Sequence, residues 1–132
     1  MKTLITLALL VLASSTVAEK STSYFCVERE AGGLKYSAGA WLGTGFNTSD
    51  KWHVKKIKDK TWEVIKFGQG ETFFSCKMDE FKQDQLACLG VYGSFRLDFE
   101  SLRFVATNDF GFDVSIKKPG SLSVGTGICS KN

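Results

Sequence analysis

Apolar and polar residues alternate in this chain over short segments, with a period of two. Phe95, Leu97 and Phe99 alternate with polar side chains, and residues 102–106 repeat the pattern. A period of two is typical of a β-strand that buries one face. No stretch after residue 19 has the period of an amphipathic helix. The pattern therefore predicts an all-β protein.

The predicted strands are stretches rich in β-branched and aromatic residues, bounded by Gly, Asn, Asp and Ser. They cover residues 24–30, 35–41, 52–57, 62–67, 72–77, 85–91, 94–99, 102–106, 110–116 and 123–129. A strand and its turn thus take about ten residues, which favours an antiparallel β-barrel or sandwich. We predict a small fold of this kind with about 8–10 short strands.

Residues 51–67 form a predicted hairpin around Asp59, and the pattern leaves the register of its two strands open. A two-residue loop would pair Val54 with Ile65, whereas a three-residue loop would pair Val54 with Val64. A slip of one residue would move a whole set of side chains to the other face of the sheet. The sequence alone does not decide between the two registers.

The first 18 residues have the pattern of a secretory signal peptide. Lys2 supplies the positive charge, residues 4–12 are apolar, and residues 16–18 are small, with cleavage expected after Ala18. The apolar run is shorter than the roughly 20 residues of a membrane-spanning helix, so we expect no membrane span. The mature protein, residues 19–132, is then a single β domain that is periplasmic or secreted.

The charge balance of the mature chain argues against a nucleic-acid partner. Without Lys2 the chain has 16 basic and 14 acidic residues, a net charge of +2. This excess is too small to indicate binding to nucleic acid or to an anionic membrane. The lysines between residues 51 and 60 are interleaved with acidic residues and tryptophan, so we assign them to a solvated hairpin.

The four cysteines predict two disulfides, because an even number in an exported protein indicates pairing. Four cysteines allow three pairings, of which we favour Cys26–Cys129 and Cys76–Cys88. The first joins the first strand to the last, and the second closes a hairpin centred near Lys82. No C-x-x-C motif is present, so neither a metal site nor a redox pair is expected.

The chain shows no clear catalytic motif. His53, the only histidine, lies within a predicted strand, and no serine occupies a nucleophile elbow. The acidic neighbours Asp79 and Glu80, or Asp98 and Glu100, could hydrolyse a glycoside only if they faced each other across a cleft. We therefore expect a non-enzymatic protein without catalytic residues or a cofactor. A small hydrolase that uses acidic residues is the alternative.

The best candidate for a binding surface is the stretch of residues 32–46, which contains five glycines. Lys35, Tyr36 and Trp41 are the candidate binding residues, because they offer a charge and aromatic stacking area. In the opposing interpretation Tyr36 and Trp41 belong to the core of an ordinary strand. For each of the three tryptophans, Trp41, Trp52 and Trp62, a core position is favoured.

Several motifs give the chain a resemblance to a family. They are "YFCVEREAGGLKYSAGAW", "KWHVKKI", "TWEVIKFG", "SCK", "GSFRLDFESLRFV" and a final "GICS". Their order is similar to that in small exported proteins of Gram-negative bacteria and their phages, which are functionally uncharacterised. The resemblance covers most of the mature chain and implies bacterial origin and export, but it assigns no functional residue.

A second resemblance, over a much shorter stretch, is to the periplasmic inhibitors of c-type lysozyme. These small, disulfide-bearing β-barrels present a Ser-Gly-x-Arg/Lys-Tyr/Phe loop to the lysozyme active site. Residues 32–36, "GGLKY", resemble that loop but have glycine in place of the serine. We therefore expect a binding protein for an unknown protein or saccharide of the cell envelope. Inhibition of a c-type lysozyme or of another cell-wall enzyme is an alternative.

Overall fold

The computed structural model describes residues 22–109 and 120–132, and these residues form β-strands joined by turns and loops. The strands are β1 (Ser23–Ser37), β2 (Ala40–Gly45), β3 (Lys51–Lys58), β4 (Thr61–Lys66), β5 (Thr72–Met78), β6 (Gln85–Gly90), β7 (Gly93–Asp98), β8 (Arg103–Asn108) and β9 (Ser121–Lys131). The predicted leader and the predicted strand over residues 110–116 lie outside the described residues.

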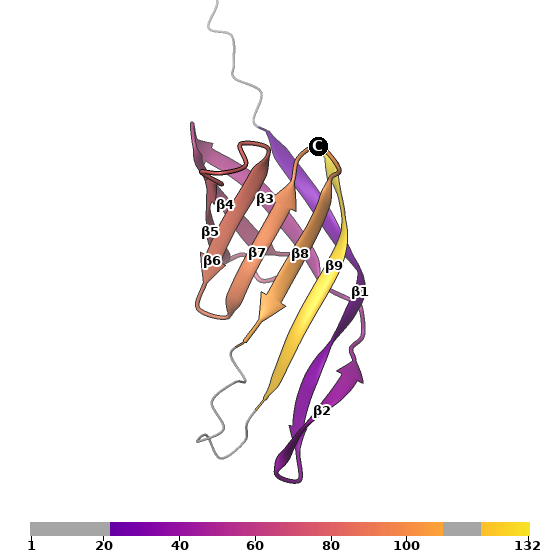
Figure 1. The fold of residues 1–132 in the computed structure, drawn as a ribbon. Helices are drawn as coiled ribbons and strands as arrows, with labels where there is room; N and C mark the ends of the chain where they lie inside the picture. The colour runs from indigo at the N-terminus through magenta and orange to yellow at the C-terminus, as the bar shows by residue number, and fades with distance from the viewer. Residues whose placement is uncertain (1–21, 110–119) are drawn as a thin grey trace, which may run out of the picture.

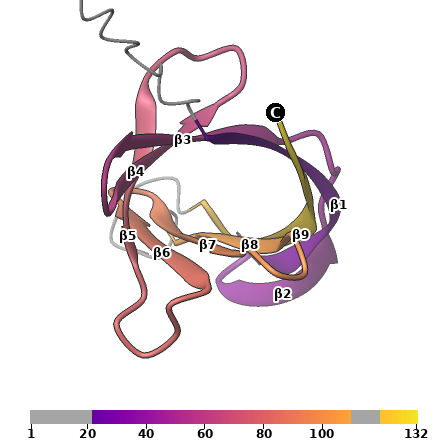
Figure 2. The same ribbon diagram turned by 90° about the horizontal axis from the view of Figure 1, so that it is seen from above.

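Eight of the strands, β1 and β3 to β9, form a closed antiparallel barrel, which Figure 2 shows end-on. From β3 to β9, each strand pairs with the next along the chain. β1 pairs with both β3 and β9 and so closes the ring. β2 pairs with β1 and lies outside this ring. The predicted all-β class is confirmed, and the barrel is found rather than the sandwich.

β1 is long enough to belong to two substructures. Its residues 23–27 pair with β3, its residues 32–37 pair with β2, and β9 follows its other edge from residue 24 to residue 35. Beyond the barrel, β2, β1 and β9 therefore form a three-stranded sheet. We call this sheet, residues 32–37, 40–45 and 121–124, the extension; it projects from the barrel at the lower right of Figure 1.

The predicted strand over residues 35–41 is wrong, because the chain turns in the middle of it. Ala38 and Gly39 have φ angles of 50° and 84°, the left-handed conformation of a two-residue type I′ hairpin turn. Ser37 consequently pairs with Ala40, and Tyr36 pairs with Trp41. The first predicted strand instead continues to Ser37.

The hairpin around Asp59 has the register in which Val54 pairs with Val64. The turn itself contains only Asp59 and Lys60, because Lys58 pairs with Thr61. A bulge between Lys56 and Lys58 supplies the missing residue. The bulge shifts the register so that two tryptophans and two valines, Trp52, Val54, Trp62 and Val64, are all buried.

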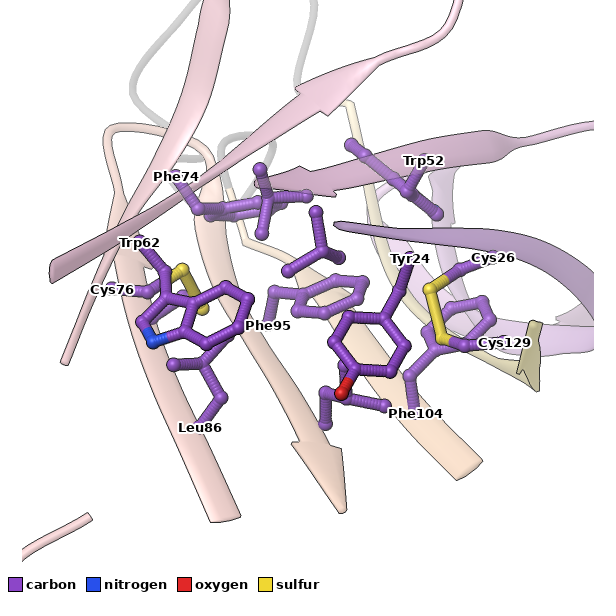
Figure 3. Close-up of a cluster of buried hydrophobic side chains, with 14 of the residues drawn as sticks. Tyr24, Cys26, Trp52, Trp62, Phe74, Cys76, Leu86, Phe95, Phe104 and Cys129 are labelled. Atoms are coloured by element: carbon purple, nitrogen blue, oxygen red, sulfur yellow. A yellow bond between two sulfur atoms is a disulfide. The ribbon is translucent and has the colours of Figure 1, made fainter. Parts of the chain in front are cut away.

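The barrel interior is filled by aromatic and aliphatic side chains together with both disulfides (Figure 3). The disulfides Cys26–Cys129 and Cys76–Cys88 are formed as predicted, and each joins residues directly opposite each other on neighbouring strands. At Gly127, any Cβ would meet the Val27 carbonyl and the Phe104 ring, so only glycine fits there. The core residues are Tyr24, Cys26, Trp52, Val54, Trp62, Val64, Phe74, Cys76, Leu86, Cys88, Phe95, Leu97, Phe104, Ala106 and Cys129.

Candidate functional site

The two faces of the extension differ in character, and strand β9 shows which face is which. In β9, Gly125 and Gly127 are buried in the barrel whereas Val124 is exposed, so Val124 lies on the outer face. Leu122 is two residues earlier and shares that face. Cross-strand partners also share a face, and Leu34 is paired with Leu122. The outer face of the extension therefore begins with three aliphatic residues.

The outer face ends in an aromatic pair near the hairpin tip. Tyr36 follows Leu34 by two residues and pairs with Trp41, and their rings meet edge to face at a centroid distance of 5.2 Å. Both side chains are half-buried, whereas Leu34 and Val124 are 39% and 47% exposed. We call Leu34, Tyr36, Trp41, Leu122 and Val124 the apolar face.

Lys35 lies on the opposite face of the extension. It pairs with Leu42 on one side and with Ser121 on the other. Each of these residues is next in sequence to a residue of the apolar face, so strand alternation places it on the opposite face. Leu42 is 54% exposed. The structure thus brings Tyr36 and Trp41 together and separates Lys35 from them. Of the three tryptophans, Trp52 and Trp62 are core residues and Trp41 is not.

The hairpin that carries the apolar face is almost uncharged. Lys35 is the only charged residue between positions 31 and 49, in a chain of which 23% is charged. Strand β2 pairs on one side only, within the part of the chain that the structure describes. It contains no proline or charged residue, the usual devices that keep an open strand edge from pairing. Both features are typical of a surface that is covered by a partner.

The acidic residues considered for hydrolysis bind the backbone of tight turns. Asp79 Oδ1 accepts hydrogen bonds from the amides of Phe81 and Lys82, and the Phe81 amide holds the pKa of Asp79 below its usual value. Asp98 Oδ1 accepts hydrogen bonds from the amide and the hydroxyl of Ser101. These bonds, with one from the Gln85 side chain, lower the pKa of Asp98. Both carboxylates have a structural role in their turns.

A charged cluster that the sequence did not predict lies at the end of the barrel next to the extension. Lys66 Nζ is 2.8 Å from an Asp50 carboxylate oxygen and lies 5.5 Å from the centre of the Trp52 ring. Glu28 borders the same cavity of about 50 Å³. Burial, and then the charge of Asp50, raise the pKa of Glu28, and the charge of Lys66 acts in the opposite direction. Asp50 and Lys66 lie at the two ends of the β3–β4 hairpin, whereas Glu28 comes from β1, which pairs with β3 only in the folded sheet. No local sequence pattern records that Glu28 joins the other two.

Within the described residues, no group of three or more His, Cys, Asp or Glu side chains is placed to hold a metal ion. In the same residues, no helix has the length and hydropathy of a membrane-spanning segment. The two disulfides are compatible with an oxidising extracellular or periplasmic environment. Comparison with protein-family models, with curated proteins and with solved structures found no match to this chain.

Proposed function

We propose that the protein is an exported, non-enzymatic binding protein whose partner docks on the apolar face of the extension. The observation that carries this proposal is a projecting sheet with five apolar side chains on one face and no charge among them. Interface centres are depleted in charge and enriched in tyrosine and tryptophan. The apolar face has this composition, and the extension that carries it projects from the barrel (Figure 1).

The partner is a protein rather than a saccharide. Leu34, Leu122 and Val124 make the larger part of the face aliphatic, and aliphatic surface is buried well by another protein. A sugar would need an open aromatic ring, whereas Tyr36 and Trp41 already pack on each other. The leader pattern, the disulfides and the resemblance to exported bacterial proteins support a partner in the periplasm or at the cell surface.

The alternatives receive less support from the geometry. Asp79 and Asp98 are committed to turn amides, which weakens the case for a hydrolase that uses them. Residues 32–36, which resemble the loop of lysozyme inhibitors, lie within β1 between β2 and β9 rather than in a loop. Lys35 and Tyr36 consequently point to opposite faces and cannot enter one active site together.

Two leucines allow a matched test of the apolar face. Leu34→Asp places a charge on the apolar face, and Leu42→Asp places the same charge on the opposite face of the same hairpin. Both leucines are exposed, so neither change disturbs the core. Wild-type protein and both variants are used as bait for envelope extract, and the captured protein is then purified and its affinity measured by calorimetry. We expect Leu34→Asp to weaken binding at least about tenfold, since a buried unpaired charge is costly.

Leu42→Asp should bind the purified partner like the wild type. Equal binding by both variants, or a loss only in Leu42→Asp, would show that the apolar face is not the docking surface. A c-type lysozyme is assayed in parallel with purified protein. Inhibition that is lost in Leu34→Asp would identify a lysozyme as the partner. Hydrolysis of a cell-wall substrate by the pure protein would contradict the non-enzymatic proposal itself.

A further inference from the structure

A pocket of about 900 Å³ opens at the end of the barrel opposite the extension. It lies between the β3–β4 turn, with Lys60, and the loop after β5, with Glu80, and the first residues of β1 border it. The mouths of β-barrels are common ligand sites, and this volume is in the range of pockets that hold small molecules. No sequence pattern predicted this site, because its residues come from four separate segments of the chain: 22–24, 56–62, 77–83 and Phe99.

The floor of the pocket is a cluster of three aromatic rings. Tyr24, Trp62 and Phe99 all line it, and each ring touches the other two. The centroid distances are 5.3 Å for Tyr24–Phe99, 5.3 Å for Trp62–Phe99 and 6.1 Å for Tyr24–Trp62. Figure 3 shows Tyr24 and Trp62 in the core cluster. The floor therefore offers a fixed apolar surface for a flat or aliphatic group.

Hydrogen-bond donors without acceptors gather beside this floor. Trp62 is 6% exposed, and its Nε1 is buried with no hydrogen-bond partner among the described residues. Lys56 pairs with Trp62 across the β3–β4 hairpin, so both side chains lie on the inner face. Within the same part of the chain, Lys56 Nζ forms no ion pair and the Tyr24 hydroxyl forms no hydrogen bond. An indole N–H and an ammonium can only donate, so the missing group is an acceptor.

The rim carries equal numbers of basic and acidic side chains, so net charge does not choose the ligand. Lys56, Lys60 and Lys77 are balanced by Asp59, Asp79 and Glu80. The preference for an anion comes from the position of Lys56, which pairs with Trp62 and therefore lies next to the rings. Asp79 already accepts hydrogen bonds from two turn amides, and Asp59 and Glu80 sit in the exposed turn and loop.

We propose that this pocket binds a small organic anion, with an apolar body on the three rings and a carboxylate at Lys56 and Trp62. The carboxylate oxygens accept hydrogen bonds from Lys56 Nζ and from Trp62 Nε1, which satisfies a buried donor that otherwise has no partner. This site is separate from the apolar face and does not depend on the function proposed for that face.

The test uses 2-naphthoate as the probe and 2-naphthalenemethanol as its neutral counterpart. Binding is followed by the indole N–H resonances of the ¹⁵N-labelled protein, in which Trp41 and Trp52 serve as internal controls. We expect saturable binding of 2-naphthoate that shifts the Trp62 resonance alone. Lys56→Met keeps most of the side chain but removes the charge, and it should raise the Kd at least about tenfold. Trp62→Phe should also weaken binding.

Lys55→Met is the matched control, because Lys55 is the next residue on β3 and lies on the outer face. It should leave the Kd unchanged, and unfolding curves of each variant confirm that the barrel is intact. Three results would overturn the proposal: no saturable shift at millimolar probe, equal affinity for the neutral counterpart, or unchanged affinity in Lys56→Met. Because Lys56→Met leaves the aromatic floor in place, the test holds even if Trp62→Phe fails to fold.

Discussion

His53 shows how a single residue links this fold to pH. It pairs with Phe25 and Ile65, and its Nε2 is buried without a hydrogen-bond partner among the described residues. Burial, and then the charge of Lys55, lower the pKa of His53, while Glu63 opposes this shift. The lowered pKa favours the neutral imidazole in the folded protein. Because Nε2 is buried within the sheet, His53 has a structural position.

The lowered pKa of His53 predicts that acid destabilises the protein. Above the ordinary pKa of about 6.5, the imidazole is neutral in both the folded and the unfolded state. Below it the unfolded state takes up a proton that the folded state does not, so the free energy of unfolding decreases as the pH is lowered. Urea unfolding at pH 7.5 and pH 5.5 should show a smaller loss in His53→Gln than in the wild type. An equal loss in both proteins would show that His53 does not contribute.

The β1–β2 hairpin is the element on which the proposed binding surface depends, and its turn is strained. Ala38 has a left-handed φ of 50°, a conformation that costs a non-glycine residue roughly 1–2 kcal/mol. Asparagine is favoured at this position of a type I′ turn. Ala38→Asn should therefore stabilise the hairpin by about 1 kcal/mol.

This gain is measured by amide hydrogen exchange in the β1–β2 ladder, because the projecting hairpin can open without unfolding the barrel. Exchange should slow about fivefold in Ala38→Asn, which corresponds to about 1 kcal/mol. Ala40→Asn, placed in the strand just after the turn, is the control and should not slow exchange. Slower exchange in both variants would point to a general effect of asparagine rather than to relief at Ala38.

At the scale of elements, the sequence predicted the strands well and the turns less well. The alternation around Phe95 and Phe104 predicted β7 and β8, because one-sided burial is recorded directly in the order of residues. The turn at Ala38 was missed, since Ala-Gly is a weak signal for a type I′ turn. Lys35, Tyr36 and Trp41 were grouped because they share a glycine-rich stretch. The turn pairs Tyr36 with Trp41, and strand alternation puts Lys35 on the opposite face. The bulge at Ile57 depends on how the tryptophans pack, which no local pattern records.

For the whole molecule, the two disulfides differ in the length of chain that they close. Cys26 and Cys129 are 103 residues apart, and Cys76 and Cys88 are 12 apart. Their pairing was predictable because the first and last strands of a barrel must meet. In addition, a hairpin centred near Lys82 puts Cys76 and Cys88 opposite each other. The pocket beside Trp62 was not predictable, since its wall comes from strands that are distant in sequence.

Loop length predicts unequal losses when each disulfide is removed. In the chain-entropy treatment, the long loop contributes about 4.7 kcal/mol and the short loop about 3 kcal/mol. Denaturant unfolding of the Cys26→Ala/Cys129→Ala protein should therefore show the larger fall in the free energy of unfolding. The Cys76→Ala/Cys88→Ala protein is the matched comparison, since all four cysteines are buried. A larger loss of unfolding free energy in the latter protein would mean that local packing at β5 and β6 outweighs the entropy of loop closure.

The pairing of β1 with β9 also sets the order in which the barrel can be completed. A ribosome delivers β1 first, and at that stage β1 can pair only with its sequence neighbours β2 and β3. Its other edge, from residue 24 to residue 35, has to wait for a strand made some hundred residues later. Contacts between residues so far apart in the sequence form slowly, because the chain entropy is lost before the contacts are gained. The barrel therefore cannot close until β9 has been synthesised.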